Sequence, residues 1–169
     1  MAKTRKLALM AVLTAISLTV FVIEAQIPAP LPIPGAKLGI ANMITLVAML
    51  LLGRKEAGAI LAVRILMGSM FAGGVSGLMF SVAGGALAYA VMCLLIGVFP
   101  EKLVWVVSVF AAIAHNAGQL AVSVLISGTV SLLVYAPALL AVGIATGAFT
   151  GVGAMYLARA LRSLDKRSN

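Results

Sequence analysis

Six long apolar runs occupy most of the chain and constrain its fold more than any other feature. A helix rises about 1.5 Å per residue, so about 20 apolar residues cross a hydrocarbon layer of about 30 Å. The runs are continuous rather than alternating, which excludes a membrane β-barrel. The sequence therefore predicts an all-α integral membrane protein, a bundle of six transmembrane helices. The expected spans are Leu7–Ile23, Leu38–Leu52, Ala57–Ala72, Gly77–Val98, Leu103–Ile126 and Ala138–Leu161.

The segments between these runs are short, so neighbouring helices are expected to pack as antiparallel pairs. Of the 169 residues, 63% are hydrophobic and 9% are charged, which excludes a soluble fold. We expect a single six-helix transmembrane domain over residues 1–169, with short basic ends.

The cations are divided unequally between the two sides of this bundle. With the N-terminus in the cytoplasm, ten of the twelve Lys and Arg residues face the cytoplasm, Lys37 faces outward and Arg64 lies within a span. This asymmetry predicts a multi-pass protein of the cell membrane with both termini cytoplasmic. No basic patch is interleaved with aromatic residues, so nucleic acid is not an expected partner. The ten cytoplasmic cations are Lys3, Arg5, Lys6, Arg54, Lys55, Lys102, Arg159, Arg162, Lys166 and Arg167.

The first run has a competing interpretation as a secretory signal peptide, because the basic residues 3–6 precede it. Glu24 and the lack of an Ala-x-Ala cleavage site favour the transmembrane interpretation.

Enzymatic motifs are missing from the sequence. The chain has one aspartate, Asp165, and neither a Walker A motif nor a Gly-x-Ser-x-Gly motif. His115 and Cys93 are the only residues of their types and lie on different spans, so neither a metal site nor a cofactor is expected. We predict that the protein is not an enzyme and that it cannot hydrolyse ATP alone.

Ionisable groups inside a bilayer are costly and are functional candidates by default. Arg64 lies near the middle of the third run, and Glu24 is the only acid within the spans that could approach it. Two interpretations are open: Arg64 pairs structurally with Glu24 or with backbone carbonyls, or it faces a cavity and binds an anionic group of a substrate.

The fifth run carries a polar cluster of His115, Asn116 and Gln119. Ser108, His115, Gln119 and Ser123 share one broad helical face, which should look into the bundle. These side chains either form hydrogen bonds between helices or line a polar pocket.

The start of the second run offers two further candidate binding residues, Lys37 and Asn42. Lys37 either extends into solvent or, with the free N–H groups of the helix, binds an anion. Together with Arg64 it would suit a carboxylate or a phosphate reached from outside.

Small residues recur at helical spacing in several runs. Gly143, Gly147 and Gly151 in the sixth run, and Gly77, Ser81 and Gly85 in the fourth, predict close packing within the bundle. Ala11 and Ala15 in the first run either pack in the same way or form a docking surface for a partner subunit. Four prolines between residues 28 and 34 stiffen the first outer loop, which is either a lid or a plain connector.

Several short motifs point to a family. A basic start leads into Ala11-Val-Leu-Thr-Ala15, a proline-rich outer loop follows, and Gly35-Ala-Lys-Leu-Gly-Ile-Ala-Asn42 opens the second run. The fifth run contains His115-Asn-Ala-Gly-Gln119. With six short spans, these features resemble the substrate-binding S-components of energy-coupling factor transporters, and most closely the Gx transporter family, also labelled heptaprenyl diphosphate synthase component I.

The resemblance implies a subunit that binds a vitamin or similar small molecule near its outer face. It implies docking through the first helix, at Ala11 and Ala15, onto a transmembrane coupling subunit that carries two cytoplasmic ATPases. Residues 26–37 would form the gate. The synthase label implies an alternative, a membrane accessory subunit of isoprenoid or quinone biosynthesis without a catalytic site of its own.

Overall fold

The computed structural model describes residues 3–27, 39–72 and 74–167, and these residues form helices and no strand. Two short 3-10 helices, η1 and η2, accompany six α-helices. The α-helices are α1 (Lys3–Gln26), α2 (Asn42–Leu51), α3 (Arg54–Ala72), α4 (Gly74–Leu95), α5 (Val104–Ser127) and α6 (Ala136–Arg167), with η1 at Glu101–Leu103 and η2 at Val130–Tyr135.

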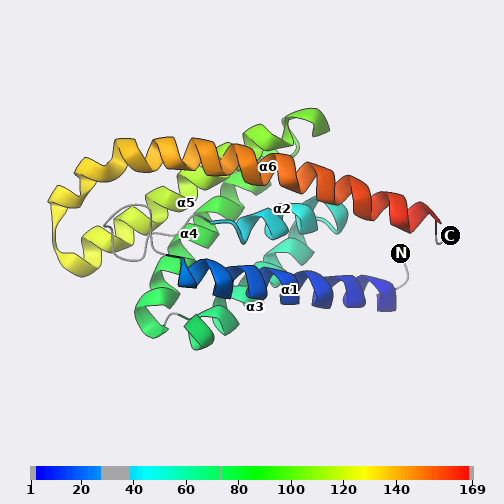
Figure 1. Ribbon diagram of the computed structural model, residues 1–169, viewed down its shortest axis with the longest axis horizontal. Coiled ribbons are helices and arrows are strands. Elements are labelled where there is room, and N and C mark those ends of the chain that lie inside the picture. The colour runs from blue at the N-terminus through cyan, green and yellow to red at the C-terminus, as the bar shows by residue number, and fades with distance from the viewer. Residues whose placement is uncertain (1–2, 28–38, 73, 168–169) are drawn as a thin grey trace.

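The long helices form an elongated bundle in which the start of α1 and the end of α6 lie at the same end (Figure 1). α5 packs along both α4 and α6, and η2 reverses the chain between α5 and α6 at the opposite end of the bundle. α5 ends at Ser127, and the next residue, Gly128, adopts the left-handed conformation (φ +64°) that glycine accommodates without strain.

Four helices are long and apolar enough to cross a membrane: α1, α4, α5 together with η1, and α6 together with η2. The protein is therefore an all-helical, multi-pass membrane protein. α3 is long enough but contains Arg54, Lys55, Glu56 and Arg64. Its ends differ from the predicted third span only by one additional charged turn at the start.

α2 differs most from the prediction. Its ten residues extend about 15 Å, roughly half of the hydrocarbon thickness. The helix begins only at Asn42, because Gly39 before it adopts a left-handed turn (φ +76°). α2 lies at the centre of the bundle and contacts α1, α3, α4 and α6. The side chains of α2 are buried on nearly every face of the helix. A short apolar run can therefore be a buried core helix, and its composition alone does not distinguish it from a membrane span.

The glycines of α6 pack against α5, as predicted. A Cβ atom added at Gly147 would lie 2.6 Å from the Cα of Val109, and one at Gly151 would lie 2.5 Å from the Cα of Trp105. The stripe in the fourth run is only partly buried. Ser81 and Gly85 face the interior, whereas a Cβ atom at Gly77 would meet nothing within 4 Å.

Candidate functional site

A polar cluster links three helices at the buried start of α2. Arg64 of α3 is 3% exposed, and its Nη2 donates a hydrogen bond of 3.3 Å to Oδ1 of Asn42. Its guanidinium carbon lies 5.6 Å from the centre of the Phe21 ring of α1, within range of a cation–π interaction. The aromatic face thus supplies part of the environment that this buried cation needs.

Asn42 connects Arg64 to His115 of α5. Nδ2 of Asn42 lies 3.2 Å from Nδ1 of His115. Arginine can only donate, so Oδ1 of Asn42 must face Arg64 and its amide nitrogen must face the histidine. The amide then donates to Nδ1, which fixes a neutral imidazole with its proton on Nε2. Three of the predicted site residues, Asn42, Arg64 and His115, are therefore brought together.

Two glycines make room for the His115 ring. A Cβ atom at Gly84 of α4 would lie 2.7 Å from both Cε1 and Nδ1 of the ring, and one at Gly39 would lie 3.2 Å from Cδ2. The ring is thereby held between α4 and the turn that precedes α2. Sequence reasoning identified the histidine but missed both glycines, because a glycine carries no signal of which distant side chain it accommodates.

Glu24 of α1 has a role that the sequence did not reveal. It is 4% exposed, and its carboxylate accepts hydrogen bonds from the backbone N–H of Gly39 and, at 3.4 Å, from that of Ala41. A negative side chain at the start of α2 also complements the helix dipole. Among the described residues no carboxylate forms a direct ion pair with Arg64. Glu24 forms its hydrogen bonds with the start of α2 and attracts the guanidinium only over a longer distance.

The Arg64 guanidinium is short of acceptors. It has five N–H donors, and its Nε finds no hydrogen-bond partner among the residues that the structure describes. Within the same described ranges, three buried hydroxyls also make no hydrogen bond: Ser17 of α1, Thr45 of α2 and Ser81 of α4. Buried polar groups are usually satisfied, so such a group calls for a bound molecule or for water.

The other predicted binding residues are placed differently. Gln119 is buried one turn after His115, and its Cγ would lie 3.2 Å from a Cβ atom at Gly84. Asn116 turns toward α6, where Nδ2 donates to the carbonyl of Leu139 at 2.9 Å. This bond matches the interhelical alternative for Asn116. Lys37 and the predicted proline-rich gate lie outside the described residues.

The predicted docking residues Ala11 and Ala15 are both exposed on α1. The opposite face of the helix packs into the bundle through Leu13, Ser17 and Phe21. The two alanines therefore do not pack against other described helices.

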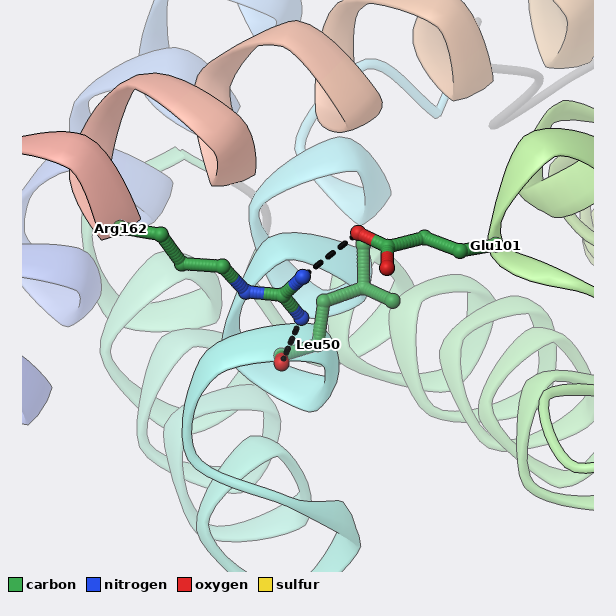
Figure 2. Close-up of polar contacts among 3 residues, drawn as sticks. All are labelled: Leu50, Glu101 and Arg162. Carbon is green, nitrogen blue, oxygen red and sulfur yellow. Dashed lines mark hydrogen bonds and ion pairs between the residues drawn. The ribbon is translucent and has the colours of Figure 1, made fainter.

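A second polar site holds the far end of α2, as Figure 2 shows. Arg162 of α6 donates from Nη1 to Glu101 at 2.5 Å and from Nη2 to the carbonyl oxygen of Leu50 at 2.9 Å. A cation at the C-terminal end of a helix complements its dipole. Both ends of α2 are thus bound by charged side chains of the appropriate sign, Glu24 at one and Arg162 at the other.

Comparison with known proteins gives one family. The family model described as heptaprenyl diphosphate synthase component I matches residues 13–157. Neither the curated proteins nor the solved structures gave a match. The matched range includes all of α2, α3, α4 and α5, and with them the Arg64 cluster. The chain therefore belongs to the heptaprenyl diphosphate synthase component I family.

Proposed function

We propose that this protein is the substrate-binding membrane subunit of an energy-coupling factor importer for a small, anionic, vitamin-like molecule. The observation that carries the proposal is the buried Arg64, whose Nη2 bonds to Asn42 and whose Nε has no hydrogen-bond partner among the described residues. A charge within a membrane protein needs a counter-charge or strong hydrogen bonds. A carboxylate or phosphate of the substrate would supply both.

Arginine suits this role because its planar fork binds a carboxylate or a phosphate through two parallel hydrogen bonds. Asn42 occupies one donor of Arg64 and fixes the orientation of His115. Nε and the remaining donors would be used by the ligand. Gln119, buried on the same face of α5, would add a polar contact.

The proposal includes a topology of six passes with both termini in the cytoplasm. Two features support it: the start of α1 and the end of α6 share one end of the bundle (Figure 1), and the sequence assigns ten cations to the cytoplasmic side when the N-terminus is placed there. The second pass would comprise α2 and the segment before it. The substrate would reach Arg64 from the outer side.

The energy for import would come from partners. The sequence has no Walker A motif, so a transmembrane coupling subunit and two cytoplasmic ATPases would drive the transport cycle. The exposed face of α1 around Ala11 and Ala15 would dock onto the coupling subunit, since small residues let two helices approach closely. The paired replacements Ala11→Trp and Ala15→Trp should abolish co-purification with that module.

The binding role is tested by mass spectrometry of small molecules retained by gently purified protein. We expect wild-type protein to retain an anionic compound that Arg64→Ala loses and Arg64→Lys retains in part, because lysine keeps the charge but not the fork. Arg159→Ala, at an exposed position of α6, is the matched control and should behave as wild type. Equal retention by Arg64→Ala and wild type would refute the role of Arg64.

The family description supports a second candidate, a membrane accessory subunit of isoprenoid biosynthesis that has no catalytic site of its own. A prenyl diphosphate is also an anion, so Arg64 would serve both functions. An assay of polyprenyl products with and without the protein separates the two candidates, since an unchanged rate removes the second.

A further inference from the structure

A hollow of about 400 Å³ opens between the first turns of α1 and α3, and the residues that line it are separate from those of the Arg64 cluster. Its charged lining comprises Lys3 and Lys6 from α1 and Lys55 and Glu56 from α3. Three ammonium groups therefore face one carboxylate. The N–H groups at the start of α3 add to the positive potential.

Lys6 and Glu56 neutralise each other within this lining. The Lys6 ammonium forms an ion pair and hydrogen bond with the Glu56 carboxylate. This hydrogen bond holds the pKa of Glu56 below its ordinary value, so the carboxylate stays ionised at neutral pH. The positive charges of Lys3 and Lys55 are in excess, and an anion in the hollow would meet both.

The rest of the lining is apolar. Leu7 and Met10 of α1 and Ala59 of α3 continue the hollow along the helices toward the bilayer interior. Leu7 is 65% exposed, which is common for a side chain that faces lipid. A ligand that matches the whole hollow has an anionic head and an apolar tail.

We propose that this hollow binds an acidic phospholipid, with its phosphate group between Lys3 and Lys55 and its acyl chain along Leu7, Met10 and Ala59. A lipid fits better than an acidic protein segment, because the charged and apolar parts of the lining follow one another along helices that enter the bilayer. The inference requires only that α1 and α3 lie in a membrane. It stands or falls independently of the proposed transport function.

The test measures lipid binding to the full-length protein by native mass spectrometry. The probes are phosphatidylglycerol and phosphatidylcholine with identical acyl chains. We expect phosphatidylglycerol to bind more tightly, and the double variant Lys3→Gln/Lys55→Gln to weaken its binding by on the order of tenfold or more, since each basic residue near an acidic membrane surface contributes measurably. The matched control Lys102→Gln/Arg159→Gln removes two cations elsewhere and should leave binding unchanged.

A second variant tests the shape of the hollow without changing charge. Ala59→Trp should fill the apolar part and lower retention of phosphatidylglycerol, with a thermal midpoint in phosphatidylcholine equal to that of wild type. Equal binding of both lipids, or equal loss in the control variant, would overturn the proposal. Displacement by soluble glycerol phosphate at matched concentration would assign the hollow to a free anion instead. If the double variant Lys3→Gln/Lys55→Gln bound phosphatidylglycerol as wild type does but no longer co-purified with a protein partner, the hollow would be a protein contact and the lipid proposal would be wrong.

Discussion

The two ends of α2 are held by opposite charges in different surroundings. Glu24 binds the N-terminal end from α1 and is 4% exposed, whereas the side chain of Arg162 at the C-terminal end is 42% exposed. At the buried end the N–H of Ala41 is fully buried and that of Gly39 is half-buried, so water replaces a lost acceptor there less readily. At the exposed end water can replace the arginine. The same type of contact should therefore contribute very differently to stability.

The largest effect is expected at the buried end. Glu24→Ala leaves the buried N–H of Ala41 and the half-buried N–H of Gly39 without this acceptor and removes the charge at the helix start, which should lower the free energy of unfolding by about 2–4 kcal/mol. Chemical denaturation in detergent measures the change. Glu101→Ala, which removes a carboxylate at the exposed end of α2, is the control and should cost less than half as much. Equal losses would show that burial does not separate the two ends.

A smaller effect is expected where His115 meets α4. Gly84→Ala places a methyl group 2.7 Å from two atoms of the imidazole, so the ring must move and its contact with Asn42 weakens. Overpacking of this kind costs about 1–3 kcal/mol. Gly77→Ala on the same helix meets nothing within 4 Å and should be neutral or slightly stabilising. Thermal unfolding of the pair checks the difference, and a cost that is the same at both positions would contradict the tight fit.

At the exposed end of α2, Arg162→Ala should lower the free energy of unfolding by about 1 kcal/mol or less, because partly exposed ion pairs and helix-end charges contribute little. The loss should shrink further in high salt. A loss as large as that of Glu24→Ala would mean that the C-terminal end is closed to water.

The smallest effect concerns pH at the ion pair of Lys6 and Glu56. Because the folded state holds the pKa of Glu56 below its ordinary value of 4.5, folding is favoured while the carboxylate is ionised. This contribution is complete above the ordinary value and is lost as the pH falls through the lower, folded value. Unfolding midpoints between about pH 3 and pH 6 should therefore fall less steeply toward acid in Glu56→Gln than in wild type. Parallel pH profiles would argue against the pair.

Hydropathy predicted the class of the protein and placed most helices to within a few residues, because lipid exposure demands long apolar segments whatever their partners. It was least accurate at α2, whose helix is shorter than the predicted run, because a core helix and a span have the same composition. Arg64, Asn42 and His115 were identified because polar groups in apolar runs are conspicuous. Their mutual contacts, the capping role of Glu24 and the need for Gly39 and Gly84 depend on helix packing between distant segments, which one sequence does not specify.

The central claim is that Arg64 binds a ligand and does not stabilise the fold. The most direct test compares the free energy of unfolding of ligand-free wild type with that of Arg64→Met. A cation whose partner is an absent ligand destabilises the empty protein, so we predict that the variant is as stable as wild type or more stable by about 1–3 kcal/mol. A loss of about 3–5 kcal/mol, as expected when a structural buried pair is broken, would contradict the account.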